Sequence, residues 1–473
     1  MDSNSTTSAP GSKQNTSRTN KVIAIVVVIA VATAGLTLLV TRALGPFASL
    51  ELESSTPTAK ATVGTDTNAS GGKYLQFGSG ATSGGGGGDT TPPPAAGSYW
   101  TDYYKTWSNG PDPTGDPKYF PIGVWMQDPS RIFNGKPNGT NYQNIGINLD
   151  VGIWEDDFSN LRYDGLTQTG WKGIIPGERA GTSYGKNAAS WWIEDEADMN
   201  MWNDPAKFNT QVIKKSADAA KAKDPTRPTY ANYGKTMAPG GCIAYYNQSK
   251  CDVDLPAYCD AVDLVSVDFY GYTDPWIENS KAGAWWYGAV LDSLRERCNH
   301  NPKKPVWGFV EAMSPDYHST RAITPDEMEA AIWNMVVHGA NGLIYFAHDF
   351  GGTGAEDGML HDAAISARAA KVNAQIKSLA PILNSYSQSG VSATGTNGIP
   401  VSTMYKVYNG SKYVFAAADG NDSHTNSGTT TGTITVPVSS GTATVVNENR
   451  TVTISGGKIV DTFKPYQMHV YQF

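Results

Sequence analysis

The sequence predicts an α/β fold built on a (β/α)8 barrel, or TIM barrel, followed by a small C-terminal all-β sandwich. Two observations predict it. Over residues 98–383, eight short apolar runs alternate with amphipathic stretches of helical length, as in repeated βα units. Over residues 384–473, apolar positions recur every second residue between Gly, Asn and Ser turns. A doubly wound sheet is the competing fold, but no Gly-rich phosphate loop follows the first run.

The composition excludes several classes of protein. The chain has 473 residues, of which 11% are aromatic and 17% charged, and its net charge is −8. This aromatic content is too high for a disordered chain, and the negative charge does not attract a phosphate backbone, so no nucleic-acid partner is expected. All 13 Trp lie between Trp100 and Trp333, within the predicted barrel.

The first part of the chain predicts a membrane anchor. Residues 22–40 are apolar or small and carry no charge, and Lys13, Arg18 and Lys21 lie in the preceding residues 1–21. This length suits a bilayer-spanning helix, and the positive flank indicates that residues 1–21 are a cytoplasmic tail. We expect a single-pass signal anchor in the cell membrane with the C-terminal domains outside the cell. A cleaved secretion signal is the alternative.

Residues 41–97 predict a low-complexity linker rich in Gly, Ser, Thr and Pro. A run of five glycines at residues 84–88 favours flexibility, and the prolines at residues 92–94 favour stiffness. Such a segment is typical of a tether that holds a domain away from the membrane. The aromatic patch at residues 73–77 interrupts it, either as a docking segment or by chance.

Four cysteines lie in the part of the chain that we expect to be exported, where conditions are oxidising. Their even number predicts two disulfides. Proximity in the sequence favours Cys242 with Cys251 and Cys259 with Cys298 among the three possible pairings. A zinc site is disfavoured because no CxxC motif occurs.

The barrel elements can be placed along the chain. We expect helices at residues 206–222, 285–297 and 324–338, the last beginning with a Thr-Pro-Asp-Glu start signal. The expected strands are residues 119–126, 145–153, 170–175, 190–193, 227–232, 262–269, 305–310 and 342–346.

Carboxylates follow two of these strands. Four of the five residues after the fourth strand are acidic, namely Glu194, Asp195, Glu196 and Asp198. Glu311 closes the apolar seventh strand. Barrel enzymes place reactive groups at the C-terminal ends of strands, and a lone ionised carboxylate is costly to bury. A salt-bridge network at the barrel rim is the structural alternative to catalysis.

This pattern resembles the retaining (β/α)8 glycoside hydrolases, the cellulase- and β-galactosidase-like clan, over roughly residues 119–350. The resemblance implies that Glu196 is the acid/base and Glu311 the nucleophile of a double displacement. In such enzymes the two carboxyl groups lie about 5–5.5 Å apart. The clan commonly has Asn before the acid/base, where this chain has Asp195, so Glu194 and Asp195 remain alternative proton donors.

Further residues near the strand ends are candidates for substrate binding. The clan often has a Tyr that contacts the nucleophile after strand six, which maps to Tyr270, and a Trp after strand eight, where this chain has His348. For each candidate, core packing or a structural role is the alternative. The predicted substrate-binding residues are Asp195, Tyr270, Trp125, Trp154, Trp307, His348, Asp128 and Asp150.

The sequence therefore predicts a membrane-anchored extracellular glycoside hydrolase that acts on a carbohydrate and needs no cofactor or metal. It shows no HxH pair, no nucleophile elbow and no Walker loop. A non-catalytic glycan-binding barrel and an inverting glycosidase are the alternatives. Sugar identity, linkage, endo or exo action and any protein partner are not specified by these patterns.

Overall fold

The structure is a computed structural model of the chain. It describes residues 61–65, 73–77, 98–153, 165–167, 169–182, 187–275, 283–419 and 428–473. Trp154 and the predicted anchor at residues 22–40 lie outside these ranges. No helix among the described residues is long and apolar enough to cross a membrane.

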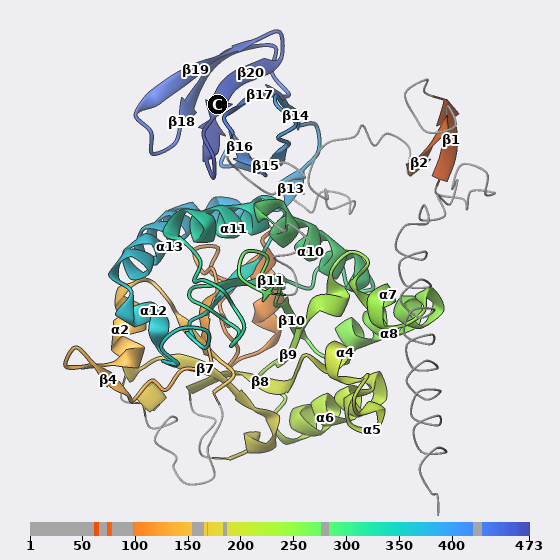
Figure 1. Cartoon of the computed structure of the whole chain (residues 1–473), viewed down its shortest axis with the longest axis vertical. Helices are drawn as coiled ribbons and strands as arrows, with labels where there is room; N and C mark the ends of the chain where they lie inside the picture. Colours follow the sequence, from red (N-terminus) through yellow and green to blue (C-terminus); the bar gives the residue numbers. More distant parts are fainter. Residues whose placement is uncertain are drawn as a thin grey trace, which may run out of the picture. The chain divides into compact units, whose positions relative to one another are not determined.

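Eight parallel strands close into a barrel in chain order, which confirms the predicted α/β barrel (Figure 1). Each predicted strand overlaps an observed one, although several observed strands are shorter because their flanks turn into loops. The strands are β3 (Ile122–Trp125), β6 (Leu149–Val151), β7 (Lys172–Pro176), β8 (Ala188–Asp195), β9 (Thr229–Tyr233), β10 (Leu264–Val267), β11 (Val306–Glu311) and β12 (Gly342–Phe346).

Helices surround the barrel (Figure 1), and the three predicted ones are present as α6 (Thr210–Lys223), α10 (Ala284–Arg297) and α11 (Pro325–Val337). The start of α11 has the expected physical cause, because Thr324 and Glu327 form a capping box. The other helices that the structure describes in this region are the 3₁₀ helices η3 (Trp100–Thr106), η4 (Gly177–Arg179) and η6 (Lys235–Met237), and the helices α2 (Asn138–Asn144), α4 (Ala197–Asn200), α5 (Pro205–Phe208), α7 (Gly241–Tyr245), α8 (Gln248–Ala261), α12 (Gly358–His361) and α13 (Ala363–Leu383).

The barrel interior is a packed core, and it contains two of the predicted sugar-stacking tryptophans. Trp307 is 0% exposed and donates its indole N–H to the Tyr104 hydroxyl at 3.1 Å. Trp125 is 4% exposed and packs edge-on against Trp192 and Phe309. The prediction that Trp125 and Trp307 stack on a sugar is therefore wrong: side chains on barrel strands alternate, and these two point inward, where close packing excludes a ligand.

The C-terminal region is all-β, as predicted, but its strands form one continuous nine-stranded sheet rather than two separate sheets. Hydrogen bonding runs in the order β13-β15-β16-β21-β18-β19-β20-β17-β14, and buried apolar residues such as Val414, Ile434 and Phe463 form its core. The strands are β13 (Ser387–Gln388), β14 (Ser392–Gly395), β15 (Val401–Tyr408), β16 (Ser411–Ala418), β17 (Thr430–Thr435), β18 (Ser440–Val445), β19 (Arg450–Ser455), β20 (Lys458–Phe463) and β21 (Met468–Gln472).

A hydrogen-bond network joins this sheet to α10 and α11. The His338 ring contacts the Asp292 carboxylate through Nδ1 at 2.7 Å and the Ser402 hydroxyl through Nε2 at 3.0 Å. Ser402 donates its proton to Asp419, which also accepts from Asn334. Because the proton of Ser402 points to Asp419, the hydroxyl oxygen accepts from Nε2–H while Nδ1–H donates to Asp292. This interface network is therefore complete when His338 carries both protons.

We expect the interface network to stabilise the fold more at acidic than at alkaline pH. Burial alone lowers the pKa of His338, but the Asp292 and Asp419 carboxylates raise it above its ordinary value. A raised pKa in the folded state gives stability that is present below the unfolded value of about 6.5 and is lost as the pH rises through the folded value. His338→Gln should cost about 1.5–3 kcal/mol at pH 5.5 and less at pH 8.5, measured by denaturant unfolding.

The matched control is His318→Gln, because the His318 ring is exposed on a loop and pairs only locally with Asp316. This control should leave the free energy of unfolding close to that of the wild type at both pH values. An equal loss at pH 5.5 and pH 8.5 in His338→Gln would contradict a charged His338.

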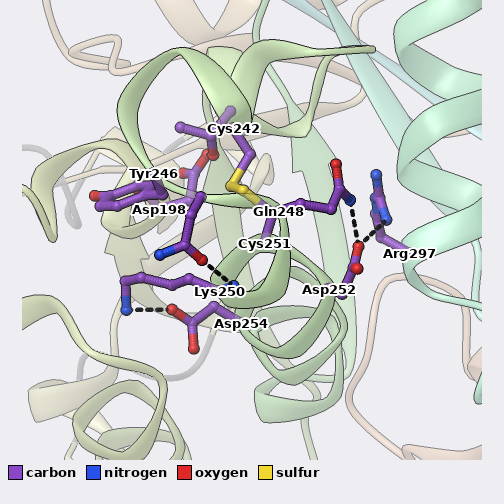
Figure 2. Close-up of a disulfide and its surroundings, with 11 residues drawn as sticks. Asp198, Cys242, Tyr246, Gln248, Lys250, Cys251, Asp252, Asp254 and Arg297 are labelled. Atoms are coloured by element: carbon purple, nitrogen blue, oxygen red, sulfur yellow. Dashed lines mark hydrogen bonds and ion pairs between the residues drawn. A yellow bond between two sulfur atoms is a disulfide. The ribbon is translucent and has the colours of Figure 1, made fainter. Parts of the chain in front are cut away.

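Both predicted disulfides are present. Cys242–Cys251 joins α7 to α8, and Cys259–Cys298 joins α8 to the residue that follows α10 (Figure 2 shows the first). No cysteine of the described residues is free. The two bonds restrain the segment between β9 and β11, which carries part of the site described below.

Two short strands lie within the predicted linker. β1 (Ala61–Thr65) and β2 (Lys73–Phe77) pair antiparallel, with Ala61 opposite Phe77. The low-complexity composition did not predict this pair, and β2 coincides with the aromatic patch noted above. The boundaries assigned to the tail, the anchor and the linker remain predictions.

Candidate active site

The turn after β8 places two carboxylates at the C-terminal end of the barrel. The first four residues of β8 are buried and the last four, ending at Asp195, are partly exposed. Glu196 follows in the left-handed conformation (φ 47°, ψ 37°) and precedes α4. Its N–H donates to the Asn232 carbonyl at 2.9 Å. A non-glycine residue in this conformation costs on the order of 1–3 kcal/mol and is typical of functional sites.

Asp195 is held by a chain of hydrogen bonds that crosses three strands. Its carboxylate accepts from the Asn232 amide at 3.0 Å, and Asn232 accepts from the Ser266 hydroxyl at 2.7 Å. The Ser266 hydroxyl also contacts the Tyr230 hydroxyl at 2.6 Å. Burial and the neighbouring Glu196 carboxylate raise the pKa of Asp195 to about 8. Asp195 therefore holds its proton to a higher pH than an exposed aspartate does.

The other two acids of the 194–198 run point away from the barrel mouth. Glu194 lines a cavity of about 290 Å³ between β8 and α6, together with Lys207. Asp198 is 1% exposed and accepts from the Gly234 N–H at 2.9 Å and from the Thr236 hydroxyl. Asp198 thus fastens α4 to the loop after β9, so it has a structural role.

Asp268, which follows β10, completes an acid pair with Glu196. The two carboxyl groups are hydrogen bonded to each other, which requires that one of them holds a proton. Burial and the charges of Glu196 and Asp195 raise the pKa of Asp268 well above its usual range. Burial also raises the pKa of Glu196, while Asp268 and the Lys235 ammonium act in the opposite direction. The pair therefore keeps an available proton at neutral pH.

Lys235 and Gly234 limit the space around Glu196. The Lys235 ammonium forms an ion pair with Asp274, which is 5% exposed. A Cβ atom at Gly234 would lie only 2.9 Å from the Glu196 Oε1. The loop after β9 therefore packs directly against the carboxyl group of Glu196.

Glu311 closes β11, as predicted, but it is 0% exposed. Its Oε2 accepts from the Tyr287 hydroxyl at 2.6 Å, and its Oε1 accepts from the Tyr272 N–H at 3.1 Å and the Thr273 hydroxyl at 3.2 Å. Burial raises the pKa of Glu311 to about 7, although these three donors favour the ionised form. A carboxylate in this state is half ionised near neutral pH.

Two predicted substrate-binding residues, Tyr270 and His348, lie on the same side of the barrel end as the acid pair Glu196 and Asp268. Tyr270 is partly exposed at the top of the barrel, and its hydroxyl lies 3.5 Å from the Asp268 Oδ2. His348 is 5% exposed and packs on Phe346. Tyr270 therefore adjoins the candidate acid pair, and His348 is joined to it through Phe346, which also contacts the Tyr270 ring.

Asp128 and Asp150 occupy structural positions. Asp128 accepts from the Ser130 N–H and hydroxyl, at 2.9 and 2.7 Å, and so closes its own turn. Asp150 is 0% exposed, and its Oδ1 accepts from the Gln127 N–H at 3.3 Å. The residues on either side of Asp150 in β6 face the barrel interior, so Asp150 points outward. The prediction that Asp150 binds substrate is therefore wrong, whereas substrate binding by the partly exposed Asp128 remains a prediction.

Sequence reasoning missed four residues of the site. Asp268 ends a buried strand, so the same strand-end rule that selected Glu196 and Glu311 could have found it. Asn232 ends β9 beside Tyr233 and gave no comparable signal. Lys235 begins the 3₁₀ helix η6 (Lys235–Met237) and Tyr287 lies in α10, and no local pattern distinguishes them from other residues of their type.

The arrangement can carry out acid–base chemistry. It combines Glu196 and Asp268, which share a proton, with Asp195 and Glu311, whose pKa values burial raises to about 8 and about 7. Carboxyl groups held in different protonation states are what a general acid and its partner base require. Among the described residues, no group of three or more His, Cys, Asp or Glu is arranged to hold a metal ion.

Comparisons with known proteins give similarities of fold only. No protein-family model and no curated protein matches the sequence. Among solved structures, the chain is similar to a β-galactosidase from the psychrophilic Marinomonas ef1 (12% identity, TM-score 0.39), over 55% of this chain and 60% of that one. It is also similar to a glucosidase from Croceicoccus marinus (10%, TM-score 0.40; 74% and 94%) and an α-L-arabinofuranosidase from Thermotoga maritima (11%, TM-score 0.42; 75% and 96%).

Fold and site together define a (β/α)8 barrel protein with a cluster of carboxyl groups at the C-terminal ends of its strands.

Proposed function

We propose that this protein is a glycoside hydrolase in which Glu196 is the acid/base and Glu311 the nucleophile. One observation carries the proposal: the ends of β8, β10 and β11 bring acids of different protonation to one end of a barrel. Glycosidic cleavage needs this combination, because a poor leaving group must be protonated while a carboxylate meets an oxocarbenium-like centre.

In the first step, the proton of Glu196 passes to the glycosidic oxygen and the Glu311 carboxylate attacks the anomeric carbon. The carbon–oxygen bond to the leaving sugar breaks, and an ester bond to Glu311 forms. In the second step, Glu196 takes a proton from water, which attacks the same carbon and releases Glu311. Asp268 supports the first step, because its hydrogen bond holds Glu196 in place and the proton that the two groups share is the one that Glu196 transfers.

Glu311 is completely buried beneath the loop after β10 and α10. One of its carboxylate oxygens must therefore become accessible before Glu311 can act as a nucleophile. The Tyr272 and Thr273 donors lie on that loop, so a shift of the loop on substrate binding would expose Oε1. Its remaining bond to Tyr287 would keep the carboxylate oriented during attack.

The pH dependence of kcat/KM should reflect the ionisation of Glu311. Its pKa of about 7 predicts that kcat/KM falls on the acid side near pH 7, where the nucleophile becomes protonated. Tyr287→Phe removes a donor that favours the ionised form, so this limb should move about one to two pH units upward. The matched control is Tyr345→Phe, which removes a buried hydroxyl bonded to Asn373 instead. If the acid limb of the kcat/KM profile does not move in Tyr287→Phe, ionisation of Glu311 does not control the activity, and Glu311 is not the nucleophile.

The experiment that tests the proposal is a glycan panel. The purified full-length chain is incubated with plant, bacterial and fungal polysaccharides and oligosaccharides, and release of reducing ends is followed. Release from one class of glycan is the expected result. Proton NMR of the first-formed anomer then separates retention from inversion, and an inverted product would replace the double displacement with a single one.

The complete burial of Glu311 favours a second candidate, a barrel that binds glycans without cleaving them. In that case the acid cluster would supply hydrogen bonds to sugar hydroxyls rather than a proton for catalysis. Binding to a glycan without release of reducing ends would support this candidate.

We also propose that the barrel is displayed outside the cell by an anchor at residues 22–40. The charge pattern of residues 1–40 supports this location. The two disulfides support it independently, because such bonds persist in oxidising compartments. Protease treatment of intact cells should degrade the barrel if it is displayed.

A further inference from the structure

A continuous series of aromatic rings runs from the acid pair to the surface of the barrel mouth. The Tyr270 and Phe346 rings are 5.1 Å apart between centroids, Phe346 and His348 are 5.0 Å apart, and His348 and Phe350 are 4.8 Å apart. Tyr317 stacks on Phe350 at 5.0 Å with an interplanar angle of 24°. We call these five residues the aromatic path.

The two ends of the aromatic path differ in environment. At the inner end, Tyr270 lies beside Asp268, the partner of Glu196. At the outer end, Tyr317 is 74% exposed, the largest value among the exposed large apolar side chains of the described residues. The Tyr317 ring is backed by Phe350 and leaves aromatic surface open, on which the apolar face of a ligand can pack.

The turn that carries Tyr317 is held in place by its neighbours. The Ser319 hydroxyl donates to the Thr273 carbonyl at 2.9 Å, on the loop after β10. A Cβ atom at Gly351 would lie 2.6 Å from the Asp316 carbonyl, so the loop after β12 approaches this turn as closely as only glycine permits. The Tyr317 ring is therefore preorganised, which lowers the entropic cost of binding a ligand on it.

We propose that the aromatic path is a binding subsite for the sugar rings of a glycan chain, with Tyr317 as its outermost platform. This inference rests on the proposed function and deepens it: the substrate is a polymer or long oligosaccharide whose chain extends several sugars beyond the bond that is cut. The same residues connect the loops after β10, β11 and β12, so the chain leaves the acid pair over this side of the mouth.

The chemistry of the aromatic path fits a carbohydrate better than a purely apolar ligand. Sugar rings combine an apolar face, which packs on an aromatic ring, with an edge of hydroxyl groups. Polar groups lie at the two ends of the path, namely the Tyr270 and Tyr317 hydroxyls, while the buried His348 ring packs against Phe346 and Phe350. A lipid or an apolar peptide would leave these groups desolvated at a cost.

The test compares Tyr317→Ala with the wild type and with Tyr317→Trp, which keeps a ring at the same place. Two properties of the full-length chain are measured: KM for oligosaccharides of increasing length, and retardation in native gels that contain each polysaccharide of the panel. Val460→Ala is the control for loss of an exposed apolar side chain, because Val460 is 59% exposed on β20 of the C-terminal sheet.

We expect Tyr317→Ala to raise KM by about two- to tenfold, and the increase in KM to be larger for longer oligosaccharides. Tyr317→Trp should restore the wild-type KM. If Tyr317→Ala hydrolyses oligosaccharides of every length with the wild-type KM, the proposed subsite is wrong, while the proposed function remains intact. Retardation that depends on Tyr317, without hydrolysis, would support the subsite and reject the hydrolase. Neither hydrolysis nor retardation with any glycan would reject both.

Discussion

Glu196→Gln should lower the rate of glycan hydrolysis by about 10²–10⁴-fold or more, because the amide cannot supply the proton that the leaving sugar needs. Glu311→Gln should lower it at least as far, since an amide does not form the ester intermediate. The change in each case replaces one oxygen by nitrogen in a side chain of nearly the same volume. The rate is measured as reducing ends released per folded molecule.

The fold should survive both changes. In Glu311→Gln, the side-chain carbonyl can still accept from the Tyr272 N–H and the Thr273 hydroxyl, and the Tyr287 hydroxyl can rotate to accept from the new amide. The matched control is Glu448→Gln in the C-terminal region, which replaces a carboxylate that pairs with Arg450. This control should keep the wild-type rate. Full activity in Glu311→Gln would exclude the double displacement.

Trp307→Ala should lower the free energy of unfolding by about 3–5 kcal/mol, since it empties a large volume in a packed barrel core. It also leaves the buried Tyr104 hydroxyl without its indole donor. The midpoint of denaturant unfolding measures the loss. If instead Trp307 stacked on substrate, the change would raise KM and leave stability nearly unaltered.

Trp202→Ala is the matched control for this prediction. Trp202 has the same side chain but is 64% exposed, in the segment between α4 and α5. Surface substitutions usually change stability by less than about 0.5 kcal/mol. A loss as large in Trp202→Ala as in Trp307→Ala would show that the effect does not depend on burial in the barrel core.

The backbone arrangement followed from local patterns. Each of the eight strands could be placed because an apolar run of strand length depends only on neighbouring residues. The pairing of the cysteines also followed from closeness in the sequence, which brought Cys242 to Cys251 across a single turn between helices. The all-β character of residues 384–473 was equally local, whereas its single curled sheet depends on pairings between strands far apart in the chain, such as β14 with β17.

Side-chain direction at the strand ends did not follow from these patterns. Along β8 the register to β9 shifts between Trp192 and Glu194, so counting alternate residues does not show that Asp195 lies toward the site while Glu194 lies on the outer side. Trp307 and Trp125 are of a residue type that often stacks on sugars, but both side chains point into the barrel core. Asp268 carried the same strand-end signal as Glu311 and was recognised only through its contact with Glu196.

The barrel, the following β-region, the disulfide pairs and the strand ends that carry acids could be predicted from the sequence, because each depends on periodicity or on short separation along the chain. The sharing of a proton between acids, the burial of Glu311 beneath Tyr272, Thr273 and Tyr287, and the place of Tyr317 in the aromatic path became visible only in the folded chain. Protonation, burial and ring stacking depend on groups from distant parts of the chain, and no local pattern encodes their contacts.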